Sequence, residues 1–361
     1  MTEFVRNLEI LTQLPVPEMS PVQLQQFNLE SLLARPSGKI ELLQAVKKLQ
    51  NSPDQEFLII DIGGTAIKEL VVSIKAGGVI QIDKSQQLIV KKIGAGDNYF
   101  EALLKIADRY PNLQVAVGSA GVVENNTLIT CSNAPALVEP LRQAGNFSGI
   151  FNRPVPLMND AEAVVLAGAI GVAMRDKRAR PTIGYIKSGG IGGAGIDALG
   201  NRTSLEPGHV VVAEPTLNPK GVTTLCHLFP GPRWDHVCLE KIAASGAGIE
   251  PQWEMLTGQK LSGEEIAEKM YGGDFLALQL YNTSALISAH IIEGIRTSLN
   301  FPVEDTVVVL SGGAFETHGM AGRIRQILIK NGKPMELIRA AELGLSDANM
   351  AGLAISALMA E

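Results

Sequence analysis

The stretch FLIIDIGGT at residues 57–65 decides the fold of this 361-residue chain. The apolar run predicts a buried strand, and the acid followed by two glycines predicts a tight turn at the strand's end. Glycine lets a backbone approach a polyanion closely and direct its N–H groups at phosphate oxygens. Thr65 adds a hydroxyl, and Asp61 stands where hydrated Mg²⁺ could bridge it to phosphates. We therefore predict a phosphate-binding turn; an ordinary tight hairpin with a capping Asp is the alternative.

The same unit, an apolar strand followed by an acid or a glycine turn, recurs along the chain and alternates with helices. Strands are predicted at Ala66–Ile74, Leu113–Val117, Val155–Met158, Thr182–Ile186 and Thr306–Leu310, and helices at Ile40–Leu49, Tyr99–Arg109, Ala161–Ala173, 264–300 and Asp347–Met359. No close sequence repeat accompanies the repeated architecture. The pattern predicts two α/β lobes, with ligands in a cleft at the carboxyl ends of the strands.

Composition limits the class of protein. A length of 361 residues suits two packed lobes rather than one core. No basic-then-apolar signal and no long uninterrupted apolar span is apparent, and three cysteines fit a reducing compartment, so we expect a cytoplasmic protein without membrane contact. The net charge of −6 argues against a nucleic-acid partner. Residues 1–55 are polar and interrupted by prolines; we expect a partly helical extension that packs on the main body or a partner subunit, since a basic recognition helix is lacking.

Three further segments carry candidate chemistry. Asn159-Asp160 follows a predicted buried strand and opens a helix, so Asp160 is either a general base or part of an N-cap. Glu206-Pro-Gly-His209 is either a ligand-binding segment or a solvated turn. Cys238-Leu-Glu240 is either a ligand-binding segment or a buried cysteine beside the first residue of a helix.

Taken in order, these segments resemble the ROK family of repressors, open reading frames and sugar kinases over about residues 57–361. The resemblance rests on these segments, on Ser119-Ala-Gly121, Ser132-Asn-Ala134, the glycine cluster Ser188–Gly195 and Gly312-Gly313, and on the closing LSDANMAG at 345–352. It implies the two-lobed actin-like ATPase fold, which is ribonuclease H-like. The expected parts are the extension at 1–55, a small lobe over 56–172 to which a helix in 346–361 returns, and a large lobe over 173–345.

The resemblance also implies a reaction: ATP- and Mg²⁺-dependent phosphorylation of a hexose hydroxyl, as in glucokinases or N-acetylhexosamine kinases. Asp160 would be the base that activates the hydroxyl. The implied sugar-binding residues are Gly121, Asn133, Asn159, Glu206, His209 and Glu240, and the implied nucleotide-binding residues are Asp61, Gly63, Gly64, Thr65, Gly190, Gly192, Gly193, Gly312 and Gly313. Such a site, built to bond each hydroxyl, rejects analogues that lack one. By analogy with the family we expect a homodimer.

Two departures from the family pattern leave alternatives open. The second phosphate loop reads SGGIG at 188–192 where the family has Gly-Thr-Gly-Ile-Gly, so a threonine hydroxyl is missing, and Lys187 or Ser188 is a candidate replacement donor. The family's zinc cysteines are reduced to Cys226 and Cys238, which with His209 and one of two neighbouring histidines could bind Zn²⁺, or the metal is lost. The alternatives to an ATP-dependent kinase are a non-catalytic sugar sensor that acts through a protein partner and a kinase that uses polyphosphate.

Overall fold

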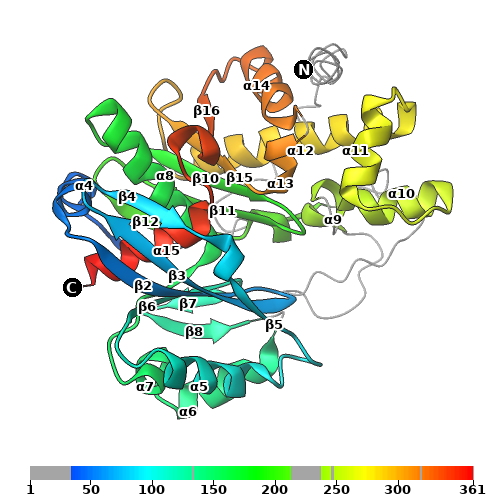
Figure 1. The fold of residues 1–361 in the computed structure, drawn as a ribbon. Coiled ribbons are helices and arrows are strands. Elements are labelled where there is room, and N and C mark those ends of the chain that lie inside the picture. The colour runs from blue at the N-terminus through cyan, green and yellow to red at the C-terminus, as the bar shows by residue number, and fades with distance from the viewer. Residues whose placement is uncertain (1–33, 132–133, 213–236, 245–247, 318, 361) are drawn as a thin grey trace. The chain divides into compact units, whose positions relative to one another are not determined.

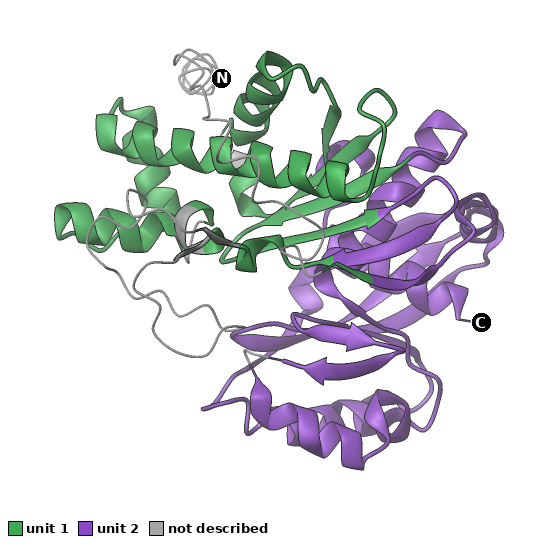
Figure 2. Ribbon diagram, turned by 180° about the vertical axis from the view of Figure 1, so that it is seen from behind, with its two compact units in different colours: residues 1–35, 181–195, 205–339 green, residues 36–180, 196–204, 340–361 purple. Residues whose placement is uncertain are grey.

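The computed structural model describes residues 34–131, 134–212, 237–244, 248–317 and 319–360 (Figure 1). The chain divides into two compact units (Figure 2). Unit 1 comprises residues 1–35, 181–195 and 205–339, and unit 2 comprises residues 36–180, 196–204 and 340–361. Residues 1–33 of the predicted extension lie outside the described residues. Its remainder contains β1 (Arg35–Lys39), which was not predicted because Pro36 reads as a breaker, and α4 (Leu42–Asn51), which confirms the predicted amphipathic helix.

Unit 2 contains a mixed sheet in the order β4-β3-β2-β6-β9, with β5 also paired to β3. Its strands are β2 (Gln55–Ile62), β3 (Ala66–Lys75), β4 (Val79–Ile82), β5 (Leu88–Lys91), β6 (Gln114–Ser119) and β9 (Leu157–Asn159). The antiparallel β2–β3 pair confirms the hairpin predicted around the glycine turn. Strands β2, β6 and β9 run parallel, so their carboxyl ends meet at one edge of the sheet.

The two faces of this sheet follow the alternation of side chains along β2. Leu58, Ile60 and Ile62 belong to a core that includes α5 (Tyr99–Arg109), α6 (Val138–Gln143) and α7 (Asn146–Phe151). The predicted helix at Tyr99–Arg109 is therefore confirmed with the same bounds. Residue 61, by the same alternation, faces the opposite side, where α15 (Ala348–Met359) contacts β2 and β6. A short hairpin of β7 (Val122–Glu124) and β8 (Thr127–Thr130) follows β6.

A long helix, α8 (Asp160–Asp176), packs closely on α15 within unit 2. The close approach depends on Gly352, because a Cβ at this position would lie 1.9 Å from the carbonyl oxygen of Ala163. Both helices are predominantly apolar and buried, so their separation is set by backbone contact and not by large side chains.

Replacing Gly352 with valine is expected to lower the free energy of unfolding by about 3 kcal/mol, because the added methyl groups overlap the backbone of α8 and must force the helices apart. Urea denaturation followed by far-UV circular dichroism measures this loss. Ala360→Val is the matched control, since Ala360 is exposed at the end of the same helix. Equal urea midpoints for the two variants would contradict this account of the helix pair.

Unit 1 contains the adjacent strands β11 (Ile191–Ile196), β10 (Thr182–Lys187), β15 (Val307–Ser311) and β16 (Glu336–Arg339), in that order. Strand β10 pairs parallel with β15, and β15 pairs parallel with β16. Helices cover them: α9 (Glu240–Ala243), α10 (Glu250–Thr257), α11 (Gly263–Tyr271), α12 (Phe275–Ser298), α13 (Gly313–Thr317) and α14 (Met320–Lys330). The predicted helical region at 264–300 is thus two helices, because Asp274 caps a new one.

Helix α12 is the central helix of the unit 1 core, to which Ala285, Ile291 and Ile295 contribute. By length and apolar composition alone α12 could cross a bilayer, which was not expected from the sequence. Most of that apolar surface is buried inside the unit.

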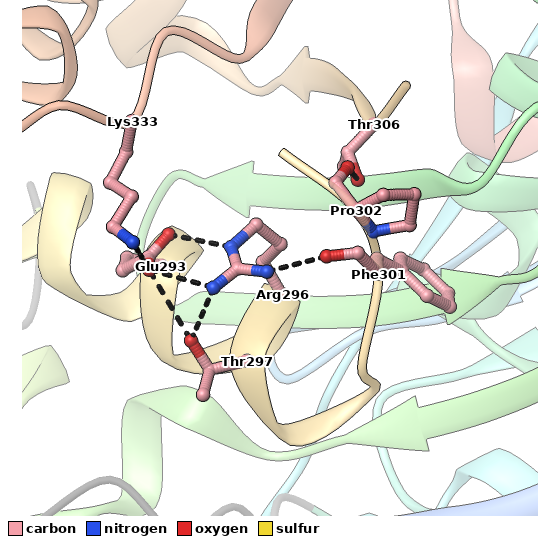
Figure 3. Close-up of polar contacts among 7 residues, drawn as sticks. All are labelled: Glu293, Arg296, Thr297, Phe301, Pro302, Thr306 and Lys333. Atoms are coloured by element: carbon pink, nitrogen blue, oxygen red, sulfur yellow. Dashed lines mark hydrogen bonds and ion pairs between the residues drawn. The ribbon is translucent and has the colours of Figure 1, made fainter. Parts of the chain in front are cut away.

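The carboxyl end of α12 is fixed by polar contacts (Figure 3). Arg296 donates to Glu293 Oε2 at 2.8 Å and to the carbonyl oxygen of Phe301 at 2.5 Å. Thr306, directly before β15, donates to the carbonyl oxygen of Pro302 at 2.5 Å. These contacts fix the segment between the helix and β15, the strand that precedes Gly312 and Gly313.

Candidate functional site

The glycine turn of unit 2 presents free backbone donors. Gly63 N–H donates to the carbonyl oxygen of Ala66 at 2.9 Å, which closes the β2–β3 hairpin. The N–H groups of Gly64 and Thr65 bond to no residue in the described part of the chain, and Thr65 is exposed. The phenol of Tyr99 donates to the carbonyl oxygen of Gly63 at 3.4 Å and so supports the turn. Two adjacent unpartnered N–H groups and a hydroxyl form the kind of concave donor set that binds phosphate.

Asp61 is buried beside this turn, with 7% of its surface exposed. Burial raises the pKa of its carboxyl, and Asp347 raises the pKa further. Lys68 lies opposite Asp61 in the β2–β3 register, with Nζ 3.2 Å from Oδ2, and lowers the pKa together with a hydrogen bond from Asn349. Burial outweighs these partners. Lys68 thus pairs with Asp61.

Replacing Asp61 with asparagine is expected to raise the melting temperature of the ligand-free protein by about 2–4 °C at pH 7. A raised pKa means that the ionised carboxylate is disfavoured in the folded state, and the resulting cost is fully present above that pKa. The same variant should lose the stabilisation by Mg²⁺-nucleotide that a metal-binding carboxylate provides. Thermal unfolding with and without Mg-ADP measures both effects.

Asp54→Asn is the control for this prediction, because Asp54 is an exposed carboxylate of the same unit whose pKa is lowered by its partners. It should melt no higher than the wild type and keep the full shift with Mg-ADP. A D61N protein that melts lower than the wild type and keeps that shift would exclude a metal-binding role for Asp61.

Asn159 and Asp160 stand at the junction of β9 and α8. Asn159 Oδ1 accepts from Ala161 N–H at 2.8 Å, and Glu162 Oε2 accepts from Asn159 N–H at 3.3 Å, which completes a capping box. Asn159 Nδ2 donates to the carbonyl oxygen of Gly121 at 3.1 Å. The amide of Asn159 therefore holds the Gly121 loop against the start of the helix. Asn159 has 5% of its surface exposed.

Asp160 is the first residue of α8 and is only partly buried. Its Oδ1 accepts from Ala161 N–H at 2.7 Å. The amino end of a helix carries partial positive charge, which favours the ionised carboxylate that a general base requires. Gly121 accepts the hydrogen bond from Asn159 and leaves no room for a side chain, because a Cβ there would lie 2.3 Å from the carbonyl oxygen of Thr130. Asn133, the remaining predicted sugar contact of this unit, lies outside the described residues.

Unit 1 brings three other predicted residues together around a short helix, Pro207–His209. His209 Nε2 lies 3.8 Å from Glu206 Oε2, and both side chains are mostly buried. The two-stranded sheet of β13 (Val211–Val212) and β14 (Val237–Cys238) returns the chain so that Glu240 begins α9 beside this helix. A Cβ on Gly208 would lie 3.3 Å from Glu240 Cβ.

The second glycine loop meets the same cluster. A Cβ on Gly190 would lie 3.3 Å from Glu240 Oε2, so this carboxylate contacts the loop. Gly192 is half-buried, whereas Gly193 is buried against Pro207 and Ile295 and serves packing. Ser188 is exposed and remains a candidate donor to phosphate, but Lys187 is not: its ammonium points into the helical layer, where it donates to Ser288 Oγ at 3.5 Å.

The turn after β15 contains the last predicted nucleotide contacts. Gly312 has a φ of +104°, and a Cβ there would lie 2.2 Å from the carbonyl oxygen of Lys187, so only glycine fits. Gly313 is exposed and begins α13, with no atom within 4 Å of a Cβ position. Of these two glycines, Gly313 is the more exposed.

The predicted zinc site falls largely outside the described residues. Cys226 and the two histidines near it are not described, and only the backbone of Cys238 is. In the described ranges no group of three His, Cys, Asp or Glu side chains could hold a metal ion. His209 is described and lies beside Glu206, so the zinc site remains a prediction.

The chain is similar to known proteins over most of its length. A model of the ROK family matches residues 57–356. No match is found among the curated proteins. A ROK hexokinase from Thermus thermophilus is 20% identical with a TM-score of 0.57, and covers 85% of this chain and 99% of its own. A ROK glucokinase from Streptomyces griseus, solved with glucose and AMPPNP, is 19% identical with a TM-score of 0.60, and covers 83% of this chain and 98% of its own.

A ROK family transcriptional regulator, homologous to the E. coli MLC protein, is 15% identical with a TM-score of 0.57 and covers 99% of this chain and 98% of its own. At these identities the solved structures establish the fold alone, which is that of the actin-like ATPases. The family model spans most of the chain, from the strand before the Asp61 turn to the helix that packs on α8. This chain therefore belongs to the ROK family.

Proposed function

We propose that this protein is a sugar kinase that transfers the γ-phosphoryl group of Mg-ATP to a hydroxyl of a hexose, either glucose or an N-acetylhexosamine. One observation carries the proposal: the N–H groups of Gly64 and Thr65, which have no partner among the described residues, lie beside buried Asp61 in a turn suited to phosphate. Family membership supports a sugar kinase, and the Streptomyces griseus relative was solved with glucose and a nucleotide analogue. A sugar kinase of this kind would bind a sugar, a nucleotide and Mg²⁺.

In the proposed reaction, Asp160 accepts the proton of the attacking sugar hydroxyl. The hydroxyl oxygen then forms a bond to the γ-phosphorus, while the bond from that phosphorus to the bridging β,γ-oxygen breaks and ADP leaves. Glu206, His209 and Glu240 orient the sugar through hydrogen bonds, with Asn159 and Asn133 as further candidates. Gly63, Gly64 and Thr65, together with Ser188, Gly190, Gly192 and Gly313, are the proposed phosphate and nucleotide contacts.

Asp61 fits a magnesium ligand, because Mg²⁺ prefers carboxylate oxygen and the raised pKa of Asp61 reflects a charge that lacks full compensation. When bound, Mg²⁺ would neutralise charge on the β- and γ-phosphates. Lys68, paired to Asp61, adds a second positive charge next to the turn.

A second candidate function is a sugar sensor without catalysis. It is favoured by the second loop, which lacks a threonine hydroxyl and cannot use buried Lys187 in its place. The similarity to a ROK transcriptional regulator is compatible with this reading. A sensor of this kind would act through a protein partner.

A coupled assay of ADP release across glucose, mannose, fructose, N-acetylglucosamine and N-acetylmannosamine tests the kinase. We expect turnover with at least one of these sugars that depends on Mg²⁺. Repeating the assay with polyphosphate in place of ATP, and measuring formation of sugar phosphate, shows which of the two phosphoryl donors the protein uses. Calorimetric sugar binding without turnover on either donor would reject the kinase and leave the sensor.

Oligomeric state and location are further proposals, both made by analogy with the family and from composition. A cytoplasmic homodimer is the expected state. Sedimentation velocity on the purified protein measures the mass directly, and a single species of 38 kDa, the mass of one chain, would reject the dimer.

A further inference from the structure

Lys187 is an unusual residue for the core of unit 1. It is the last residue of β10, it has no exposed surface, and it is among the largest fully buried side chains of the described residues. An isolated ammonium is costly to bury, and Lys is almost never fully buried unless it is paired. None of its described contacts is with a carboxylate. A leucine or methionine would fill the same space without that cost.

The ammonium of Lys187 contacts hydroxyls of α12 and sulfur of α14. Lys187 Nζ donates to Ser284 Oγ, to Ser288 Oγ at 3.5 Å and, weakly, to Met320 Sδ at 3.9 Å. Tyr185, on the same strand, also donates to Ser288 Oγ, at 3.1 Å. These contacts match the three N–H donors of a protonated lysine.

Ser284 continues this chain of hydrogen bonds to the candidate sugar-binding helix. Its hydroxyl donates to the carbonyl oxygen of Ala243 at 2.6 Å. Ala243 is the last residue of α9, and Glu240 is the first. One turn of helix therefore carries both the anchor to Ser284 and the carboxylate that contacts Gly190.

The backbone of Lys187 lies against both glycine turns of unit 1. Ser188, the next residue, begins the second loop and closes it with a hydrogen bond from its N–H to the carbonyl oxygen of Gly190 at 3.0 Å. The carbonyl oxygen of Lys187 lies 2.2 Å from where a Cβ of Gly312 would be. A single residue thus contacts the loop, the β15–α13 turn and, through Ser284, α9.

We propose that Lys187 is a positioning residue, which holds the loop at 188–192 and the Glu240 helix in the relative arrangement that substrate and nucleotide require. This inference rests on the proposed function. Lys187 touches no reacting atom and acts through Ser284 and through its own backbone. A buried polar group retained where an apolar one would pack is expected to specify one arrangement at a cost in stability.

The arrangement depends on protonation of Lys187. Burial lowers the pKa of this amine to about 7. Among the described residues, the groups that face it are Tyr185 on β10, Ser284 and Ser288 on α12 and Met320 on α14, and none of these supplies a compensating negative charge near neutral pH. Above pH 7 the amine loses one of its three donors, so the link to α9 weakens as the pH rises.

The test uses the full chain with three variants: Lys187→Met, Ser284→Ala and, as control, Lys260→Met, which makes the same chemical change at an exposed position of unit 1. Kinetics and calorimetric dissociation constants for sugar and for Mg-ADP are measured from pH 6 to pH 9. We expect K187M to weaken binding of sugar and of Mg-ADP by roughly tenfold each at pH 6.5. S284A removes the link to α9 and one acceptor of the Lys187 ammonium but leaves the backbone of Lys187 against both glycine turns, so it should weaken sugar binding more than binding of Mg-ADP.

The pH profile separates positioning from a merely structural role. Sugar affinity of the wild type should fall as the pH rises through about 7, whereas that of K187M should not follow this profile. Dissociation constants and pH profiles for K187M and S284A equal to those of the wild type would overturn the inference. Should K187M fail to fold, S284A still decides it by the split between sugar and nucleotide binding. Absence of turnover in the wild type rejects the kinase only, because the binding measurements test Lys187 independently.

Discussion

Replacing Asp160 with asparagine is expected to lower kcat by about 10²–10⁴-fold while the dissociation constant of the sugar changes by less than about tenfold. Asparagine keeps the size of the side chain at the first residue of α8 but cannot accept the proton of the sugar hydroxyl. Asp160 is partly exposed at the amino end of α8, and its neighbour Asn159 provides the capping box. The loss should therefore fall on the chemical step and leave the fold intact.

Asp176→Asn is the matched control, because it makes the same change at the opposite end of the same helix. Asp176 pairs with Arg175 and Arg180, and these pairs lower the pKa of its carboxyl. This variant should lose a little stability and keep its kcat. Steady-state kinetics, with sugar binding measured by calorimetry, compare the two. Equal kcat values for D160N and the wild type would remove Asp160 from the reaction.

Replacing Lys187 with methionine is expected to raise the free energy of unfolding by about 2–4 kcal/mol at pH 6, although the same change impairs binding. The pKa of Lys187 falls from 10.5 to about 7 on folding, and a difference of that size corresponds to an upper limit of about 5 kcal/mol. Methionine has a similar shape and is flexible enough to fill the space. The hydroxyls of Ser284 and Ser288 keep their own acceptors, the carbonyl oxygens of Ala243 and Ser284.

The higher free energy of unfolding of K187M, relative to the wild type, should disappear as the pH rises. Between the folded pKa of about 7 and the unfolded value of 10.5, the unfolded wild type binds more protons than the folded protein, so wild-type stability increases with pH in this interval. Below pH 7 both states are protonated and the full cost of burying the charge is present. Urea denaturation at pH 6, 7, 8 and 9 measures how the difference in free energy of unfolding between K187M and the wild type decreases. Lys260→Met is the control. If the free energies of unfolding of K187M and the wild type changed with pH in parallel, the result would contradict a buried charge at Lys187.

Local sequence patterns predicted most of the elements on which the candidate site stands. The apolar run before Asp61 and the glycines after it predicted the β2–β3 hairpin, because a short apolar run and a turn residue are both short-range properties. The Asn159-Asp160 pair predicted the start of α8 for the same reason, since capping involves only neighbouring residues. Strand β1 was missed because its sequence, RPSGK, lacks an apolar pattern and depends on pairing with β12 (Asn201–Leu205).

The motif residues were predicted as one set, but the structure assigns them unequal parts. The side-chain amide of Asn159 forms hydrogen bonds with the backbone of Ala161 and Gly121, and Gly193 is packed against Pro207. Such assignments depend on which distant backbone or side chain lies within about 3 Å, and no local pattern contains that information.

The Asp61 turn was determined by the sequence alone, because strand, turn and the flanking acid are set by adjacent residues and their steric preferences. The orientation of Lys187 was decided only by the tertiary structure. Its position next to the second glycine loop indicated a phosphate donor, yet its ammonium lies among hydroxyls of α12. The direction of a side chain at the end of a strand depends on what packs against each face of the sheet, and in unit 1 that layer comes from helices about a hundred residues further along the chain.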